Sequence, residues 1–387
     1  MGTRGIPSHY SGLETSCEGL YSALAHRGHQ MTVYCRRGHV TTGASRYRGV
    51  ELLRVPAARV RSLETLSHVA ASLADAAVRR RFDLIHMHAE APGLFAPLLS
   101  MARVPVVATI QGLDWQRAKW RGQGAQLIRR AERALVQHAR EIIVVSRSLQ
   151  TYFREEYNRD TWYIPNGVEE RERIAEPARL LGEWGLEERG FIVYVGRLVP
   201  EKRIEDLISA FRSVDTSLRL VVVGEGGYTR GYTAHLRAVA GNDPRVVFTG
   251  AQRGATLDAL FQAASGYVLP SEMEGLPMSL LECMAAGTPA VVSDIAPHRE
   301  LLDGVEGYDL FFPPGDVRAL SGRLSQLLAD PARYREVAER ARLRVRESYG
   351  WASRAEATEL VFQGAVERPV REAIASPGPR SPPPASS

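Results

Sequence analysis

Cysteine is scarce in the sequence, which has three copies among 387 residues, at Cys17, Cys35 and Cys283. This odd and widely spaced set argues against a disulfide framework and indicates a reducing, cytoplasmic environment. No apolar run approaches the roughly 20 residues of a membrane-spanning helix, and the opening stretch, MGTRGIPSHY, has no apolar core of the kind found in signal peptides. We therefore expect neither a disulfide-rich secreted protein nor an integral membrane protein.

Lysine is rarer still, because only Lys119 and Lys202 are lysine among the 49 lysine and arginine residues. A chain with so strong a preference for arginine that keeps a lysine at a strand–loop–helix junction indicates a need for a compact ammonium group at Lys202. The alternative is that Lys202 is an exposed residue without a special role.

Charge is unevenly distributed along the chain. Residues 1–168 carry 23 Lys/Arg and 13 Asp/Glu, a net +10, and the remainder carries 26 and 31, a net −5, which together give the overall +5. The basic half favours an anionic partner, such as a peripheral contact with anionic membrane lipids or a phosphorylated acceptor. A solvated basic surface is an equally supported alternative. Nucleic acid is not expected, since no aromatic-interleaved basic ribbon or zinc-binding spacing is present.

The length predicts two domains, and short apolar runs alternate with helical patterns in each half, which is typical of parallel α/β architecture. In the first half the predicted strands are 31–35, 84–86, 104–109, 141–145 and 162–164, and the predicted helices include 63–80 and 126–140. In the second half FIVYVG, LRLVVVGEG, VVFTG and GYVLP are predicted strands, and EKRIEDLISAFRSV is a predicted helix.

These patterns predict domains at 1–168 and 169–350, with a hinge near 166–175, a further helix over 351–367 and a disordered Pro- and Ser-rich tail over 368–387. The stretch GTRGIPSHYSGLET looks like the glycine-rich turn that follows the first strand of a doubly wound domain, yet only Met1 precedes it. The pattern therefore predicts that the first strand is missing from this sequence. We expect a start several residues upstream rather than a lost central strand, which would leave its neighbours' backbone groups unpaired.

The segment YVGRLVPEKRIEDL combines a strand, a loop and a helix start. Gly196 and Arg197 follow the strand, and Lys202 comes just before the helix. Free backbone amides at a helix start together with two cations favour a diphosphate site.

The segment SEMEGLPMSLLECMAAGTP places Glu274 before a second helix start and Glu282 about one turn inside that helix. Proline suits a first helical turn, so the helix is predicted to begin near Pro277 or Met278. Gly275 would let a ligand approach the backbone closely. Two carboxylates beside a helix start that attracts phosphate can accept hydrogen bonds from sugar hydroxyls. Alternatively, Glu274 only complements the helix dipole.

Together, the Gly-Arg-Leu-x-x-Glu-Lys motif and the later Glu-x7-Glu motif resemble those of the family-4 glycosyltransferases, nucleotide-sugar enzymes of the two-domain GT-B fold. The stretches GTRGIPSHYSGLET and GLDWQRAKW look like a rhamnosyltransferase-like subgroup of that family. The resemblance covers most of residues 1–367. It implies two Rossmann-like α/β domains that face each other across a cleft, and a final helix that crosses back to the first domain.

By this resemblance Arg197 and Lys202 would hold the donor diphosphate, Glu274 would contact the transferred sugar, and these three would be the catalytic residues. Glu282 would bind the ribose hydroxyls. The other donor-binding positions would be Gly196, Gly250, Ala251, Gly275, Leu276 and Met278, with Gly5 and Gly12 from the first domain.

The resemblance further implies a retaining enzyme that needs no metal or other cofactor, and the sequence contains no Asp-x-Asp. The charge that develops on the leaving diphosphate would be stabilised by Arg197, Lys202 and helix dipoles. The family's usual proposal is a front-face attack, in which the leaving phosphate takes the acceptor proton.

Two residues depart from the family pattern. Gln111 stands where many relatives have histidine; it can bind a hydroxyl group but cannot act as a base. Ser11 precedes Gly12 where a Gly-Gly pair is common. A ligand can therefore approach the backbone less closely at Ser11 than it could at a glycine.

The expected acceptor-binding residues are Gln111, Asp114, Trp115 and His88. Trp115 would offer a stacking face, although packing at the domain edge explains it equally well. His86 and His88 lie at a strand end, and without a third ligand nearby a satisfied or acceptor-facing histidine is a better interpretation than a metal site.

The leading hypothesis is a cytoplasmic, retaining glycosyltransferase that moves a hexosyl or deoxyhexosyl unit from a nucleoside diphosphate sugar to a glycan or lipid-linked acceptor in cell-surface polysaccharide synthesis. One alternative is another GT-B nucleotide-sugar enzyme, such as a 2-epimerase. The other is a non-catalytic protein that binds nucleotide sugars, for which Gln111 is the supporting feature.

Overall fold

The computed structural model describes residues 1–7, 11–40, 43–58, 63–79, 82–117, 122–226 and 230–367. The chain forms two compact units: Met1–Asn166 together with the C-terminal segment that begins at Trp351, and Gly167–Gly350. The tail expected over 368–387 lies outside the described residues. Within those residues, no helix is long and apolar enough to cross a membrane.

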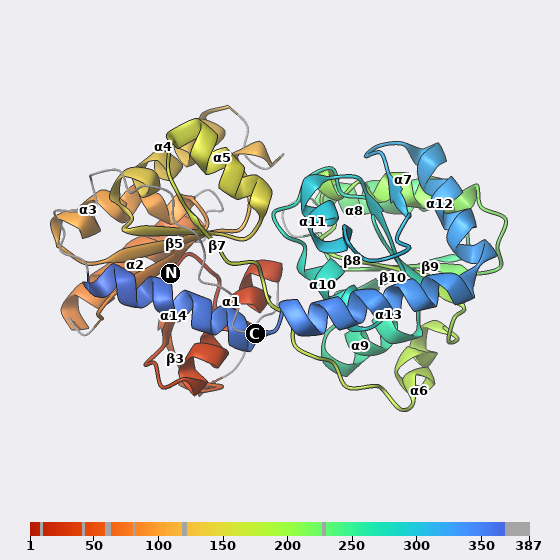
Figure 1. Ribbon diagram of the computed structural model, residues 1–387, viewed down its shortest axis with the longest axis horizontal. Coiled ribbons are helices and arrows are strands. Elements are labelled where there is room, and N and C mark those ends of the chain that lie inside the picture. The colour runs from red at the N-terminus through yellow and green to blue at the C-terminus, as the bar shows by residue number, and fades with distance from the viewer. Residues whose placement is uncertain are drawn as a thin grey trace. The chain divides into compact units, whose positions relative to one another are not determined.

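The first unit contains short strands, all paired parallel except β2 with β3, and covering helices (Figure 1). Its strands are β1 (Thr32–Arg36), β2 (Arg46–Tyr47), β3 (Val50–Val55), β4 (Ile85–His88), β5 (Val106–Ile110), β6 (Glu141–Val144) and β7 (Trp162–Tyr163). Its helices are α1 (Gly12–His26), α2 (Glu64–Arg79), α3 (Ala96–Met101), α4 (Gln123–His138), α5 (Arg147–Tyr157) and α14 (Trp351–Glu367), with short 3-10 turns η1 (Ala91–Phe95) and η2 (Asp114–Gln116).

The strands of this unit form two sheets, ordered β1-β3-β2 and β4-β5-β6-β7. Among the described residues no strand joins β1 to β4, at the place where the sequence analysis expected a strand to be missing. The segment from Met1 to Arg4 instead touches the carboxyl end of each strand. The His88 N–H donates to the Met1 carbonyl at 3.0 Å, and the Arg36 N–H donates to the Arg4 carbonyl at 3.0 Å.

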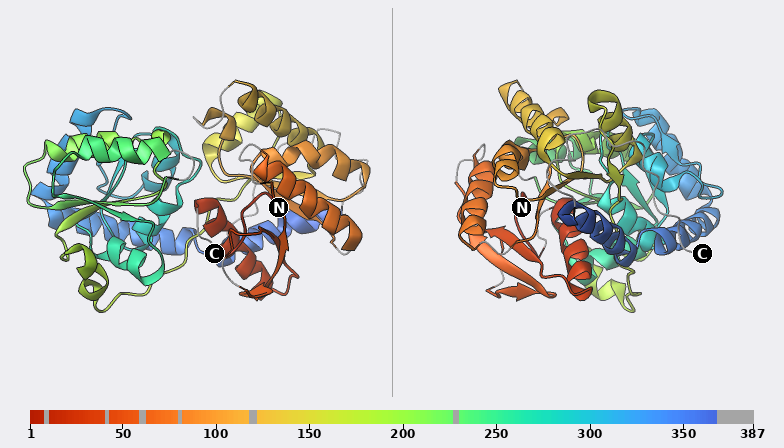
Figure 2. Two further views of the ribbon diagram at one scale, coloured as in Figure 1. Left: turned by 180° about the vertical axis from the view of Figure 1, so that it is seen from behind. Right: turned by 60° about the vertical axis from the view of Figure 1, so that its left-hand side comes forward.

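Helix α14 packs in the first unit although it follows the second unit in the chain. It lies beside α1, as Figures 1 and 2 show from different sides. Ala355 and Phe362 of α14 share a hydrophobic core with Leu20 of α1. The approach is close, since a Cβ atom on Gly19 would lie 2.2 Å from the Trp351 ring.

The second unit is a parallel sheet with helices in the connections. Its strands are β8 (Phe191–Val195), β9 (Arg219–Val223), β10 (Val246–Gly250), β11 (Gly266–Leu269), β12 (Ala290–Ser293) and β13 (Phe311–Phe312). Its helices are α6 (Pro177–Leu181), α7 (Ile204–Arg212), α8 (Arg230–Ala240), α9 (Gly254–Ala263), α10 (Met278–Ala285), α11 (Ala296–Leu302), α12 (Val317–Ala329) and α13 (Pro331–Ser348), with 3-10 turns η3 (Gly182–Trp184) and η4 (Pro200–Lys202).

The strand order of this sheet is β10-β9-β8-β11-β12-β13. The central strands β8 and β11 are buried along their whole length, as expected for apolar strands covered on both faces. The order reverses between β8 and β11, so the loops after these two strands diverge to opposite sides. Ligands of doubly wound sheets bind at such a switch point, outside the carboxyl ends of the strands.

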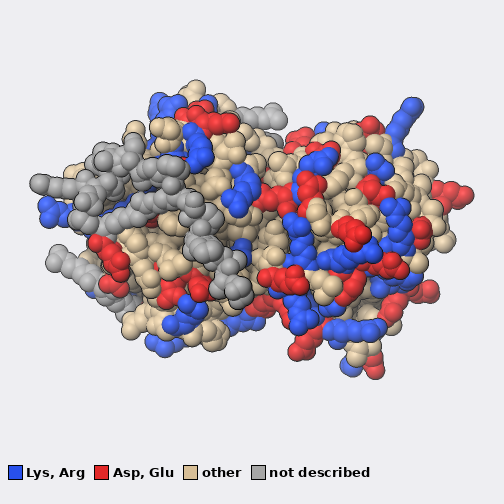
Figure 3. All heavy atoms as spheres, in the orientation of Figure 1, with Lys and Arg blue, Asp and Glu red and all other residues tan. Residues whose placement is uncertain are grey.

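One sequence expectation in this unit needs correction. The helix predicted from Glu201 begins at Ile204, after the short turn η4. Arg203 between them has a φ of 52°, a left-handed conformation that interrupts the helix. On the face shown in Figure 3, acidic and basic side chains are interspersed over this unit.

Candidate functional site

Glycines follow three neighbouring strands at the carboxyl edge of the second unit's sheet. Gly196 follows β8, Gly224 follows β9, and Gly250 ends β10. Gly224 has a φ of 146°, and a Cβ atom there would lie 1.8 Å from the Gly196 carbonyl oxygen. The two loops therefore touch through their backbones.

Lys202 and Glu274 meet across the switch point between β8 and β11. The Lys202 ammonium contacts Glu274 Oε1, and the side chains are only 12% and 10% exposed. Ser271 donates a second hydrogen bond to Glu274 Oε1 at 2.7 Å. The loops are also joined through their backbones, because the Glu272 N–H donates to the Glu201 carbonyl at 3.1 Å. The fold thus brings together two residues that the sequence analysis chose from separate motifs.

The charge state of Glu274 follows from these neighbours. Burial raises its pKa, but the charge of Lys202 and the hydrogen bonds from Lys202 and Ser271 outweigh burial, so the pKa is lowered overall. Glu274 is therefore an ionised carboxylate at neutral pH, and Lys202 is its counter-ion.

His298 is a buried neighbour of this pair that the sequence analysis missed. Its Nδ1 lies 2.8 Å from the Ser293 carbonyl oxygen, which identifies Nδ1 as the protonated nitrogen. Burial lowers the His298 pKa to about 4, so the ring is neutral at pH 7. The Ser293 hydroxyl in turn donates to the Ser271 carbonyl at 2.5 Å. This chain of contacts supports the loop that carries Glu274, and no sequence motif indicated it.

Helix α10 begins at Met278 with Pro277 as its N-cap, as the sequence predicted. The free amides of a first turn attract anions. The side chains of Leu276 and Met278 are buried, so these residues can serve a ligand at this end only through their backbones. The Tyr267 hydroxyl donates to Ser279 Oγ at 2.8 Å and ties the first turn to β11.

Glu282 lies in the second turn of α10 and pairs with Arg171 rather than with Lys202. Arg171 Nη2 donates to Glu282 Oε1 at 2.8 Å, and Arg171 Nη1 contacts Asp258 of α9. Burial raises the Glu282 pKa, and Arg171 limits the rise. The sequence analysis anticipated Glu282 but neither of the two residues that hold it in this arrangement.

The backbone of Arg197 is held in position by a hydrogen bond from β8. The hydroxyl of Tyr194, a buried residue of β8, donates to the Arg197 carbonyl at 3.0 Å. Gly250 has a φ of 73°, and Ala251 follows it as an exposed residue at the carboxyl end of β10. The second-domain residues proposed from the sequence thus lie at the carboxyl end of β10, in the segments that follow β8, β10 and β11, and in the first two turns of α10.

In the first unit, Gln111 follows β5 and forms a reciprocal amide pair with Asn166. The Gln111 amide donates to Asn166 Oδ1 at 3.0 Å, and the Asn166 amide donates to Gln111 Oε1 at 3.0 Å. Ser16 of α1 donates to Asn166 Oδ1 at 2.8 Å. Asn166 is therefore hydrogen-bonded both to Gln111 after β5 and to Ser16 of α1. The sequence did not indicate the contact between Gln111 and Asn166.

Asp114 and Trp115 lie in the turn η2, after the same strand. The Asp114 N–H donates to Glu90 Oε1 at 2.9 Å, and the Asp114 carboxylate pairs with Arg117 at 3.1 Å. The Arg129 guanidinium of α4 stacks on the Trp115 ring at 4.4 Å from its centroid. Trp115 thus packs against α4, the edge-packing alternative that the sequence left open, and stays half-buried.

His88 is 1% exposed and lies in a buried polar cluster. Its Nε2 lies 2.5 Å from the Tyr21 hydroxyl, which is also 3.0 Å from His86 Nδ1. Thr109 Oγ1 lies 2.7 Å from His86 Nε2. This placement favours the satisfied-histidine interpretation over a contact with an acceptor.

The two glycines proposed from the opening motif differ in surroundings. Gly5 is buried with a φ of 120°, and a Cβ atom there would lie 2.7 Å from Cys35 Sγ. Gly12 is exposed and begins α1, after the N-cap Ser11. Gly5 therefore serves close packing inside the first unit, and Gly12 is the more accessible of the two.

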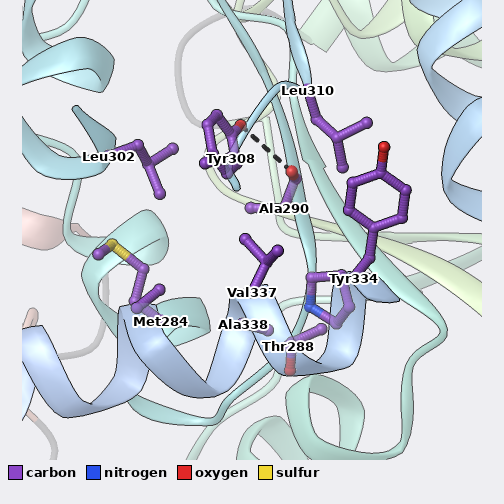
Figure 4. A pocket seen from close by; sticks show the side chains of 11 residues that line it. Met284, Thr288, Ala290, Leu302, Tyr308, Leu310, Tyr334, Val337 and Ala338 are labelled. Carbon is purple, nitrogen blue, oxygen red and sulfur yellow. Dashed lines mark hydrogen bonds between the residues drawn. The ribbon is translucent and has the colours of Figure 1, made fainter. Parts of the chain in front are cut away.

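A cavity of about 10 Å³ lies away from this edge, where Met284 near the end of α10 meets Val337 and Tyr334 of α13 (Figure 4). Its volume suffices for about one water molecule at most. It is a packing void and not a ligand site.

Comparison with known proteins identifies the family of the chain. The family described as Glycosyl transferases group 1 matches residues 182–344, and Glycosyltransferase Family 4 matches residues 10–172. A glycogen synthase of Mycobacterium tuberculosis is 30% identical over 309 residues, covering 74% of this chain and 69% of the relative. The chain therefore belongs to the glycosyltransferases and is a transferase enzyme.

Two solved structures define the fold class more closely. Sucrose-phosphate synthase from Thermosynechococcus elongatus has a TM-score of 0.78 at 24% identity, covering 94% of this chain and 95% of that one. HepE of Anabaena in complex with UDP and glucose has a TM-score of 0.77 at 19% identity, covering 93% and 98%. The protein has the GT-B fold, with two Rossmann-like α/β domains.

Proposed function

We propose that this glycosyltransferase is a retaining enzyme that moves a hexosyl or deoxyhexosyl unit from a nucleoside diphosphate sugar to a glycan or lipid-linked acceptor in cell-surface polysaccharide synthesis. The observation that carries the proposal is the meeting of Lys202 and Glu274 at the sheet's switch point. A cation for a diphosphate and a carboxylate for sugar hydroxyls are there placed side by side, in loops after adjacent strands.

In this proposal Arg197 and Lys202 bind the diphosphate, assisted by the amides of Gly275, Leu276 and Met278. Glu274 accepts hydrogen bonds from the transferred sugar, and Glu282 accepts them from the ribose. Gly196, Gly250 and Ala251 let the nucleotide approach the backbone. Two cations and a helix N-terminus stabilise the charge that develops on the leaving group, so neither a metal ion nor another cofactor is required. The leaving phosphate takes the acceptor proton in a front-face reaction.

The HepE complex contains UDP and glucose, which makes a uridine nucleotide the first donor to examine. The motif GTRGIPSHYSGLET supports a rhamnosyltransferase-like specificity, for which a deoxyhexosyl donor is the matching substrate. Gln111, Asp114 and Trp115 remain the proposed acceptor contacts, and the basic charge of residues 1–168 supports a peripheral contact with anionic lipids at the inner membrane face.

Thermal unfolding in the presence of UDP, GDP, dTDP and ADP tests the donor site. A ligand at 100 times its Kd stabilises the folded state by about 2.7 kcal/mol, which raises the Tm by several degrees. We expect one base to produce this shift in the wild type, and Lys202→Ala and Glu282→Ala to abolish it. Addition of EDTA should leave the shift unchanged.

Arg346→Gln is the matched control, since it removes an exposed ion pair with Glu170 at 3.6 Å in the same unit. It should keep the full shift. A folded wild-type protein that none of the four nucleotides stabilises would contradict the proposed function.

A further inference from the structure

The segment that enters the second unit is fastened to two of its helices just after its first residues. Arg171 contacts Asp258 of α9 and Glu282 of α10. The Ile174 N–H donates to the Gln262 side chain at 2.9 Å, and that side chain donates to the Glu172 carbonyl at 2.8 Å. Backbone and side-chain bonds to α9 thus fix the position from which Arg171 reaches Glu282.

The contact between Arg171 and Glu282 is largely shielded from water. The two side chains are 16% and 12% exposed, and Asp258 is 23% exposed. An arginine between two carboxylates presents its planar guanidinium to both, so its orientation is constrained from two sides. One carboxylate, on α9, can hold the cation while the other, on α10, serves a ligand.

Arg171 is also the charge that sets the ionisation of Glu282. Burial raises the Glu282 pKa, and among its charged neighbours Arg171 is the one that lowers it. Asp258 contacts the other terminal nitrogen of Arg171. Helix α13 also packs on α10, but its Glu339 and Arg342 pair with each other, at 2.6 and 2.8 Å. Without Arg171 the carboxyl would take up a proton at a higher pH.

We propose that Arg171 is a positioning residue of the donor site, which holds the Glu282 carboxylate ionised and oriented towards the ribose hydroxyls of the bound nucleotide. The inference rests on the proposed function, because it takes Glu282 as the ribose contact. Ribose hydroxyls donate hydrogen bonds, and an ionised carboxylate accepts them about twice as strongly as a neutral group does. Arg171 acts through Glu282 and does not itself touch the nucleotide.

The test measures the Kd of the nucleoside diphosphate that stabilises the wild type, by calorimetry between about pH 6 and about pH 9. Arg171→Gln should weaken binding about tenfold at pH 7 and return towards the wild-type Kd as the pH rises, because Glu282 then ionises without help. Glu282→Gln should weaken binding by a similar factor at every pH. A purely structural role for Arg171 would weaken binding equally across this range.

Two further variants separate action through Glu282 from an independent effect. Arg171→Gln/Glu282→Gln should bind no more weakly than Glu282→Gln alone, since the arginine has nothing left to position. Arg171→Lys should recover part of the affinity at neutral pH. Arg346→Gln, which removes the exposed ion pair with Glu170, should bind like the wild type. If Arg171→Gln does not fold, the double variant Arg171→Gln/Asp258→Asn takes its place in these measurements. The second substitution removes the carboxylate charge on α9 that the loss of Arg171 leaves without its cation.

The outcomes distinguish this inference from the proposed function. If the wild type binds a nucleotide and Glu282→Gln weakens binding, but Arg171→Gln shows a wild-type Kd, a pH-independent loss or an effect additive with Glu282→Gln, the role of Arg171 is wrong and the donor site stands. If Glu282→Gln binds like the wild type, the ribose role of Glu282 is wrong. If the wild type binds none of the nucleotides, the proposed function is wrong and this inference is wrong with it.

Discussion

Replacing Glu274 by glutamine should strengthen the binding of a nucleoside diphosphate while it weakens the transfer reaction. The Lys202 ammonium is engaged by Glu274 Oε1, and both side chains are almost buried. A diphosphate that binds Lys202 must compete with this carboxylate for the cation. It also enters beside a negative charge, since the Glu274 pKa is lowered and the carboxylate is ionised.

The magnitude follows from these charges. A carboxylate and a phosphate oxygen about 5 Å apart repel by about 3 kcal/mol at an effective dielectric constant of about 20. Lys202 between them offsets about half of this. Glu274→Gln should therefore lower the Kd of the diphosphate about tenfold, or by about 1.4 kcal/mol. The variant should lose about 2 kcal/mol of folding stability, because Lys202 is left nearly buried without its counter-ion.

Calorimetry with the diphosphate and a steady-state assay with the nucleotide sugar measure the two effects. We expect turnover to fall about 100-fold, because the carboxylate no longer binds the sugar in the transition state. Ser271→Ala, which removes a neutral hydrogen bond to the same oxygen, is the control and should change the diphosphate Kd by less than about threefold. A diphosphate Kd in Glu274→Gln that equals or exceeds the wild-type value would refute the competition argument.

Three other perturbations test separate parts of the site. Gly224→Ala should lower the free energy of unfolding by about 3 kcal/mol in a denaturant titration, because its Cβ atom would strike the Gly196 carbonyl and its φ is 146°. Lys202→Arg should weaken diphosphate binding several-fold in calorimetry despite its conserved charge, because a guanidinium can hold Glu274 through two hydrogen bonds. The Glu274 pKa is lower in the folded state, so its contribution to stability is present above the unfolded pKa of about 4.3 and is lost as the pH falls through the folded pKa. The unfolding free energies of wild type and Glu274→Gln should therefore converge as the pH falls below the unfolded pKa and through the lower folded pKa; a difference that stays constant throughout acid titration to unfolding would contradict the assignment.

Much of the second unit could be predicted from local sequence patterns. The apolar runs FIVYVG, VVFTG and GYVLP became β8, β10 and β11, and the Gly-Leu-Pro break led to α10 at Met278. The strand β12 was not anticipated, because a four-residue apolar run cannot be told from a buried helical segment by periodicity. The left-handed Arg203 had no signal, since arginine has no preference for a positive φ.

The candidate site was predictable only in part, because some of its side-chain pairs join residues that are far apart along the chain. Lys202 and Glu274 each lie in a recognisable loop motif, and parallel strands bring such loops to one edge. The partner of Glu282 is 111 residues away and that of Gln111 is 55 residues away. A side-chain pair of that kind depends on how the elements pack, and neither Arg171 nor Asn166 lies in a pattern that requires it.

The two glutamates of the proposed donor site differ in the kind of cation that holds them, and the difference matches the use of lysine in this chain. Glu282 is held by Arg171, which a second carboxylate fixes from the other side. Glu274 is held by Lys202, a compact ammonium on a flexible stem. An arginine bound on two sides keeps its partner in place during a binding event, whereas an ammonium can pass from a carboxylate to a phosphate with a small movement. A chain with 49 basic residues and only two lysines thus uses one of them where, in the proposed function, a cation changes partner.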